Sequence, residues 1–319
     1  MRKICLFIMI FCASTIFGVL LTGAPGPAMA QGQQKMFSSP DEAAQMLLEA
    51  CRNDDEKKLI EFFGEKNRDL MVTQDRAMDT YIRKKLHRFA SEKLVKQEKG
   101  KDTIIFVVGK LEWPFPFPLV KEGAKWRFDS VAGREEIINR RVGRDELNAV
   151  ALCRHYVQAQ RRYAEKAREG DDIIQYAQKF GSSPGKRDGL YWSADPSKKD
   201  DISPLGPALA ESQEYASSRK QGEPFWGYHY RILTKQGREA PGGAYSYIIN
   251  GHMVAGYALI AYPSDYGTSG MTTFIVNQSG KVYEKDLGKD TIKAAQQITE
   301  YNPDKTWKLV KEEGILATD

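Results

Sequence analysis

Apolar residues recur every three or four positions in the first half of the chain, which predicts amphipathic helices. The first helix is expected to begin near Ser38–Glu42, where a serine cap, Pro40 and two acidic residues form a typical helix start. A second helix is predicted for about residues 55–63, ending before Gly64, and a third for about residues 76–92.

Extended segments follow these helices. The β-branched run Thr103–Val108 predicts a buried strand. Residues 113–120 and 125–129 predict a hairpin around an intervening turn. Prolines alternate along residues 113–118 and cannot belong to a central strand, so this stretch is expected at a sheet edge or in a crossing loop.

A long helical segment is predicted between the two halves of the chain. Helical spacing runs from Gly133 to about Ala167, with Gly143 as a candidate break. Beyond it, Tyr, Gly and Pro dominate, which predicts a meander of antiparallel strands closed by a helix near residues 293–299. The strands are expected at residues 227–233, 245–250, 256–262, 271–277 and 282–286.

The predicted fold class is therefore α+β. Helices followed by a curved antiparallel sheet, with the closing strand Lys125–Asp129, resemble the cystatin-like fold of the nuclear-transport-factor-2 superfamily over about Phe37–Asp129. The resemblance implies a cone-shaped pocket and leaves the function open. The predicted organisation is a signal peptide (1–30), a flexible leader (31–36), a cystatin-like domain (37–132), a helical connector (133–180) and a C-terminal antiparallel sheet domain (181–319).

The first thirty residues have the pattern of an export signal. Arg2 and Lys3 precede the uncharged apolar run Ile4–Leu21, and Ala28 and Ala30 flank a methionine in the arrangement that signal peptidase reads. Cleavage is expected after Ala30, with the periplasm as the destination. An uncleaved membrane anchor is the alternative, although the run is barely long enough to span a bilayer. No later stretch of the sequence approaches a membrane span.

Charge and cysteine content narrow the function classes. The 319-residue chain has a net charge of +5, and its basic clusters at residues 83–85, 140–141 and 161–162 have acidic residues nearby. Solvated helix faces are expected there, and no nucleic-acid partner is predicted. After cleavage only Cys51 and Cys153 remain, and in an oxidising compartment they are candidates for a disulfide. Two separate buried thiols are the alternative.

Six motifs are spread over the chain: Trp113–Pro116, Ala132–Ile137, Pro184–Trp192, Ala240–Tyr245, Ala261–Pro263 with Tyr266–Gly267, and Lys285–Gly288. Together they resemble domain-of-unknown-function family 2950, a set of exported bacterial proteins. The resemblance covers nearly the whole mature chain and implies no activity. Residues 227–231, 261–270 and 274–282 more weakly resemble the C-terminal sheet of type IV pilin-like proteins. The N-terminal pilin helix is missing, so a filament subunit is not expected.

One loop is the strongest candidate for ligand binding. Lys186, Arg187, Asp188, Tyr191 and Trp192 combine a basic pair, an acid and two aromatic rings, which suits a polar ligand or a sugar ring. The alternative is structural, because Asp-Gly is a common turn and the two aromatic residues can pack it down.

Two further groups of side chains are candidates. Arg134, Glu135 and Glu136 include paired acids, but neighbouring residues on a helix point in different directions, and acids are common in a first helical turn. Tyrosines that share strand faces form either a ligand or partner surface or a half-buried sheet face. They are Tyr228, Tyr230, Tyr245, Tyr247, Tyr257, Tyr262 and Tyr266.

Motifs of known catalysis are missing. The four histidines (His87, His155, His229 and His252) do not stand at metal-ligand spacing, no Gly-x-Ser-x-Gly elbow occurs, and Gly242–Gly243 fits a turn. No metal or cofactor is predicted.

The leading hypothesis is a non-enzymatic envelope protein that binds a ligand or protein partner through an inter-domain groove and the aromatic sheet. One alternative is a periplasmic hydrolase of a glycan or peptide that uses carboxylates such as Asp188 and Glu135. Another is an assembly or chaperone role of the pilin-like sheet.

Overall fold

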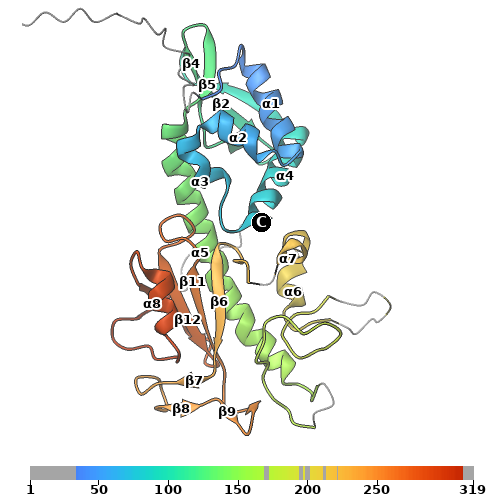
Figure 1. Cartoon of the computed structure of the whole chain (residues 1–319), viewed down its shortest axis with the longest axis vertical. Helices are drawn as coiled ribbons and strands as arrows, with labels where there is room; N and C mark the ends of the chain where they lie inside the picture. Colours follow the sequence, from blue (N-terminus) through green and yellow to red (C-terminus); the bar gives the residue numbers. More distant parts are fainter. Residues whose placement is uncertain are drawn as a thin grey trace, which may run out of the picture.

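The computed structural model describes residues 34–168, 172–193, 197, 202–210, 213–220 and 222–311. Helices and antiparallel sheets occupy separate parts of the chain, which confirms the predicted α+β class (Figure 1). The predicted signal peptide lies outside the described residues. Residues 34–36 of the predicted leader are described, and the Gln34 amide donates hydrogen bonds to the carbonyl oxygens of Phe62 and Phe128.

The N-terminal helices begin and end where their capping residues predict. Helix α1 (Pro40–Arg52) is capped by Ser39, whose hydroxyl accepts a hydrogen bond from the Glu42 amide. Helix α2 (Glu56–Phe63) ends at Gly64, which has a φ of 86°. The short η1 (Glu65–Asn67) and α3 (Arg68–Met71) lead to α4 (Arg76–Glu92), which Asp75 caps.

The N-terminal sheet contains β1 (Leu94–Glu98), β2 (Thr103–Val108), β3 (Trp113–Pro114), β4 (Leu119–Glu122) and β5 (Lys125–Phe128) in the order β1-β2-β4-β5. The proline-rich segment lies at a sheet edge, one of its two predicted places: β3 pairs with one end of β2 over two residues, and β4 pairs with the other end of β2. Phenylalanine side chains fill the space between helices and sheet, and a cavity of about 10 Å³ remains beside Phe106 and Phe115. A cavity of that size holds about one water molecule.

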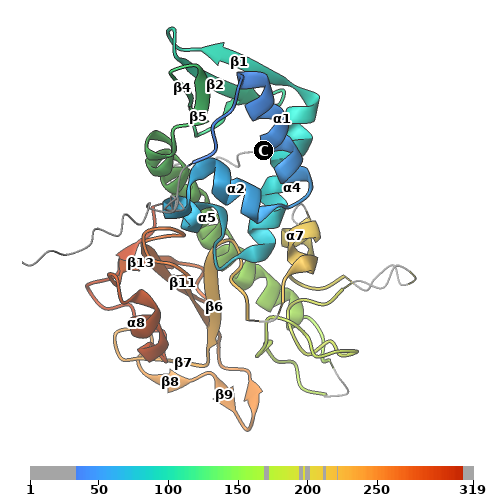
Figure 2. The same cartoon turned by 45° about the horizontal axis from the view of Figure 1, so that its top comes forward.

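Helix α5 (Ser130–Tyr163) joins the two halves as one continuous element of 34 residues. The expected break at Gly143 was wrong: the helix passes through this residue, and a side chain there would meet open space. The helix also ends at Tyr163, earlier than the predicted connector, and the described residues 172–180 are irregular. Figures 1 and 2 show α5 running from the N-terminal sheet down to the C-terminal sheet.

The C-terminal sheet is an antiparallel meander, as predicted. It contains β6 (Tyr228–Leu233), β11 (Ala258–Pro263), β12 (Thr272–Asn277), β13 (Val282–Asp286) and β14 (Lys308–Leu309) in the order β14-β13-β12-β11-β6. Helix α5 packs mainly on β12, while α8 (Thr291–Gln297) packs on β11. Neighbouring residues of β6 point to opposite faces of the sheet: Arg231 donates hydrogen bonds to the carbonyl oxygens of Ala295 and Ile298 at the end of α8, and the preceding residue, Tyr230, packs against Phe180.

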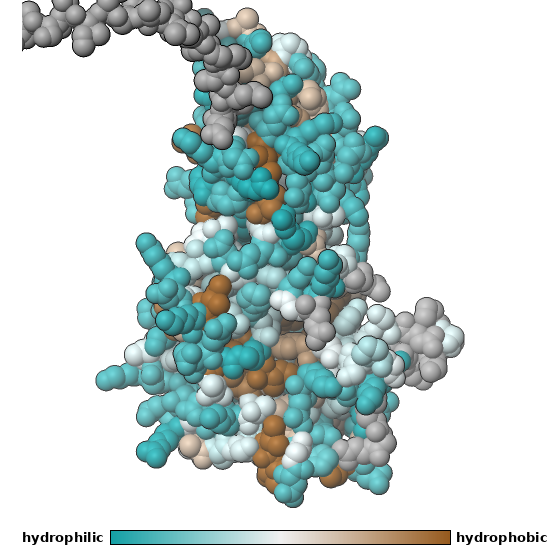
Figure 3. All heavy atoms as spheres, viewed as in Figure 1, coloured by the Kyte–Doolittle hydropathy of each residue, from teal (hydrophilic) through white to brown (hydrophobic). Residues whose placement is uncertain are grey.

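Shorter elements complete the C-terminal half. The predicted strand at residues 245–250 is divided into β8 (Tyr245–Ser246) and β9 (Ile248–Ile249), which pair with β7 (Lys235–Gln236) and β10 (His252–Met253). Helices α6 (Gly206–Leu209) and α7 (Gln213–Ser218) lie to the side of the C-terminal sheet, and α7 packs against α4 (Figure 1). On the face shown in Figure 3, hydrophobic residues form separate patches within a largely hydrophilic surface.

Each half of the chain has its own hydrophobic cluster, and each cluster contains one cysteine, Cys51 or Cys153. Cys51 is buried with the N-terminal helices and sheet, and Cys153 is buried between α5 and the C-terminal sheet. Both thiols are free, so the disulfide predicted as one alternative is not formed, because the two residues belong to different cores. Burial raises the pKa of each thiol to about 12, which keeps both sulfurs protonated.

Candidate ligand-binding site

The loop from residue 179 to residue 192 closes on itself through backbone hydrogen bonds. The Tyr191 amide donates to the Phe180 carbonyl oxygen at 2.8 Å, and the Ser182 amide donates to the Tyr191 carbonyl oxygen at 2.8 Å. Gly189 packs so closely on the other side of the loop that an added Cβ would lie 2.7 Å from the Gly181 carbonyl carbon. The loop therefore has a defined shape that brings its two ends together.

Asp188 holds this loop in place. Its carboxylate accepts hydrogen bonds from the Lys179 ammonium at 2.6 Å, from the Ser183 amide at 2.7 Å and from the Ser183 hydroxyl at 2.9 Å. Desolvation favours a higher pKa for this carboxyl, but the hydrogen bonds outweigh it and lower the pKa to about 2. The geometry supports the turn interpretation of Asp188–Gly189.

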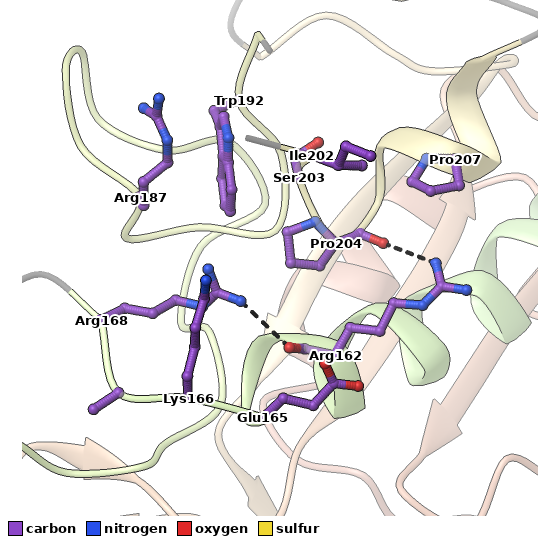
Figure 4. Close-up of a pocket in the computed structure, with 11 residues that line it drawn as sticks. Arg162, Glu165, Lys166, Arg168, Arg187, Trp192, Ile202, Ser203, Pro204 and Pro207 are labelled. Carbon is purple, nitrogen blue, oxygen red and sulfur yellow. Dashed lines mark hydrogen bonds between the residues drawn. The ribbon is translucent and has the colours of Figure 1, made fainter. Parts of the chain in front are cut away.

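A cavity of about 610 Å³ opens between this loop and the end of α5 (Figure 4). Four of its described lining residues are basic: Arg162, Lys166 and Arg168 at or just beyond the end of α5, and Arg187 on the loop. Glu165 is the one acidic residue among the described lining.

Part of the cavity lining is apolar. It consists of Trp192, Ile202, Pro204 and Pro207, and Figure 4 shows Trp192 between Arg187 and Ile202. Ile202 is 63% exposed, so its hydrocarbon surface is accessible from the cavity.

Trp192 holds two of the arginines. The guanidinium carbon of Arg187 lies 5.1 Å from the centre of the indole ring, and that of Arg168 lies 5.6 Å from it. Arg168 also donates hydrogen bonds to the carbonyl oxygens of Tyr163 at 3.0 Å and Arg162 at 3.3 Å, at the end of α5. Burial lowers the pKa of Arg168, but an arginine stays charged at neutral pH.

The cavity includes two of the residues predicted from sequence, Arg187 and Trp192. Lys186 is exposed on the same loop but does not line the cavity, and Tyr191 packs against the C-terminal core. The three basic residues near the end of α5 were missed. Their signal was present in the charged segment 161–168, but a solvated helix face explained it equally well.

The tyrosines do not form one binding surface. Tyr228 and Tyr230 pack in the core, where the Tyr228 hydroxyl donates to the Thr272 carbonyl oxygen at 2.9 Å. Tyr247 and Tyr257 are also buried. The remaining three are partly or fully exposed at separate places: Tyr245 near Gln278, Tyr262 beside His229, and Tyr266, which donates to Asp286 at 3.1 Å. The half-buried sheet face is the better interpretation of the set.

The acidic pair at the start of α5 does not form a catalytic dyad. Arg134 makes a bidentate ion pair with Asp69, with N–O distances of 3.0 and 2.6 Å. Glu136 pairs with Arg140 at 2.6 Å, and Glu135 is exposed. Among the described residues, no group of histidine, cysteine, aspartate or glutamate side chains is arranged to hold a metal ion.

A second buried polar cluster joins the two halves of the molecule and was not predicted. Trp226 and Gly227 form a two-residue turn with φ values of 48° and 71° at the start of β6. The Asp75 carboxylate accepts hydrogen bonds from the Gly227 amide at 3.2 Å and from the Tyr215 hydroxyl at 2.6 Å. The same carboxylate caps α4, so it connects that helix to the C-terminal half.

Asp145 of α5 lies against the other side of this turn. Its Oδ1 accepts a hydrogen bond from Arg144 at 2.9 Å, and its Oδ2 would lie 2.5 Å from a Cβ added to Gly227. Burial raises the pKa of this carboxyl to about 6 despite the positive charge of Arg144. These contacts hold α4, α5 and the start of β6 together.

Comparisons with known proteins identify one family to which this chain is similar. No helix in the described part of the chain combines the length and apolar character needed to cross a membrane. Comparison with curated proteins and with solved structures found no match. A family match covers residues 34–310, in agreement with the six motifs noted in the sequence. The chain therefore belongs to the family described as protein of unknown function (DUF2950).

Proposed function

We propose that this protein is a binding protein for an anionic ligand, which it holds in the cavity between α5 and the loop at residues 179–192. The observation that carries the proposal is a 610 Å³ cavity whose described lining has four basic residues and one acidic residue. That volume lies in the range of small-molecule sites, and guanidinium groups suit carboxylate and phosphate oxygens.

The arrangement of carboxylates favours binding over hydrolysis. Glu135 and Arg162 are 27 positions apart on the same straight helix, which places Glu135 about 40 Å from the cavity at 1.5 Å per residue. Two carboxylates that hydrolyse a glycosidic bond lie about 5–10 Å apart. Asp188, the other carboxylate in the hydrolase hypothesis, is held by Lys179 and Ser183.

Export remains part of the proposal. The basic start, the apolar run Ile4–Leu21 and the Ala-Met-Ala motif support cleavage after Ala30 and a function in the periplasm. Expression of the full chain in a Gram-negative host tests this: a periplasmic product with Gln31 as its first residue is expected. A cytoplasmic product that retains Met1 or Arg2 would contradict it.

A thermal-unfolding screen of the chain from residue 31 tests ligand binding. Organic carboxylates, phosphates and neutral sugars should be compared at equal ionic strength. A ligand at 100 times its Kd stabilises the folded state by about 2.7 kcal/mol, so anionic compounds are expected to raise the melting temperature and neutral sugars are not.

Two arginine variants locate the binding. The Arg187→Gln variant should lose the shift, because it removes a cation from the cavity. The Arg161→Gln variant is the matched control: Arg161 is on the last turn of α5, but it donates to the Gln278 carbonyl oxygen and does not line the cavity. Equal shifts in both variants would place the binding elsewhere and refute the proposal.

A further inference from the structure

On the basis of the proposed binding function, we infer that the ligand carries two anionic groups on a short hydrocarbon body, with one group at Arg187 and the other at the basic end of α5. The two sets of cations come from different chain segments. Arg187 belongs to the loop, whereas Lys166 and Arg168 follow α5, and Figure 4 shows the two sets on different sides of the cavity.

The guanidinium groups are held before the ligand arrives. Arg168 and Arg187 both stack on the Trp192 ring, and Arg168 is also hydrogen-bonded to the end of α5. An arginine that is already fixed loses less conformational entropy on binding. Arg168 uses its Nε and one Nη on the Tyr163 and Arg162 carbonyl oxygens, so the remaining donors at this end are its other Nη group and the Lys166 ammonium. Cations at two places in the cavity favour a ligand with two oxyanions over a ligand with one.

The helix end alone does not explain this much positive charge. The last carbonyl groups of a helix carry roughly half a negative charge, and basic residues are common there for that reason. Arg168 offsets the negative charge at the end of α5 by donating hydrogen bonds to the Tyr163 and Arg162 carbonyl oxygens. Lys166 and Arg187 also line the cavity, and Arg187 belongs to a different segment from the helix.

The apolar wall indicates what lies between the two charges. Ile202, Pro204 and Pro207 offer hydrocarbon surface on the side of the cavity away from Arg187, Lys166 and Arg168. A fully polar ligand, such as a free inorganic anion, would leave this surface in contact with water. A short aliphatic chain between two anionic groups would cover it.

Calorimetric titration of the chain from residue 31 tests the inference with a matched pair of probes. Adipate and hexanoate have six carbons each and differ by one carboxylate. A second charge-assisted contact is worth about tenfold or more in affinity, so adipate should bind at least tenfold more tightly than hexanoate. Pyrophosphate and phosphate form the second pair, and they show whether phosphate groups serve as well as carboxylates.

Variants separate this inference from the proposed function. The Arg187→Gln variant should bind adipate and hexanoate with similar affinity, whereas Arg161→Gln should keep the difference. Circular dichroism of each variant checks that it is folded.

If hexanoate binds the unaltered protein as tightly as adipate, and phosphate as tightly as pyrophosphate, the ligand needs one charge: the inference fails and the binding function stands. If none of the four probes binds but the screen identifies another anion, the two-charge inference also fails. If no anion binds in either experiment, both fail.

Discussion

The pH dependence of stability can be tested at one buried carboxyl, Asp145. In the unfolded chain its pKa is the ordinary 3.8, and in the folded protein burial raises the pKa to about 6. This difference corresponds to roughly 3 kcal/mol of folding free energy. Because the folded state binds the proton more tightly, the contribution of Asp145 to stability is complete below pH 4. It is lost as the pH rises to about 6.

The Asp145→Asn variant removes this titration and keeps an oxygen that can accept the Arg144 hydrogen bond. The stability of the variant relative to the unaltered protein should therefore increase by roughly 2.5 kcal/mol between pH 4 and pH 7. Titrating groups that lie far from residue 145 contribute equally to both proteins and cancel in the difference. Urea denaturation followed by circular dichroism at pH 4, 5, 6 and 7 measures it.

The Asp188→Asn variant is a control of opposite sign. Hydrogen bonds from Lys179 and Ser183 lower the pKa of Asp188 to about 2, so its contribution to stability is present above pH 4 and is lost as the pH falls toward 2. This variant should lose stability relative to the unaltered protein as the pH rises from 2 to 4. A stability difference for Asp145→Asn that stays constant from pH 4 to pH 7 would refute the argument that burial controls this carboxyl.

Three further predictions concern packing and thiols. Gly189→Ala should cost about 1–3 kcal/mol because its Cβ meets backbone atoms, whereas Gly181→Ala, with open space around it, should stay within about 1 kcal/mol; equal melting temperatures of the two variants would contradict this. Tyr215→Phe should cost about 1.5–3 kcal/mol in urea denaturation at pH 7, because it removes a hydrogen bond to a buried carboxylate and takes away the acceptor of the Trp226 amide; an unchanged urea midpoint would count against it. Cys51 and Cys153 should resist a thiol reagent in the folded protein and both react in urea without reductant; a failure to react in urea would restore the disulfide.

The sequence predicted the parts of the fold that depend on local chemistry. Caps such as Ser39 and breakers such as Gly64 marked helix ends to within a residue or two. The edge strand β1 (Leu94–Glu98) was missed because its side chains are mostly exposed and mixed in polarity, which removes the alternation that identifies a strand. Gly143 was taken as a break because glycine weakens helices. The parts of α5 before and after Gly143 each pack into a hydrophobic cluster, and this packing keeps the helix continuous.

The candidate site was predictable only in part, for a related reason. Arg187 and Trp192 are close in sequence, so a motif could identify them. Their partners Arg162 and Arg168 come from the end of a distant helix, and only the closed loop brings the two segments together. The contact between Asp75 and Gly227 joins residues separated by 152 positions and had no local signal.

Helix α5 contributes to both hydrophobic clusters, with Ile137 and Ile138 packed against the N-terminal cluster and Ala149 to Tyr163 within the C-terminal one. Removing either half would leave a stripe of this helix uncovered and prone to aggregation. Shared core elements also make unfolding cooperative, so we expect a single transition for the whole chain. The boundaries between predicted domains are therefore unsuitable as cutting points. For the same reason, the halves of this protein would have to be inherited together and could not be exchanged as separate modules.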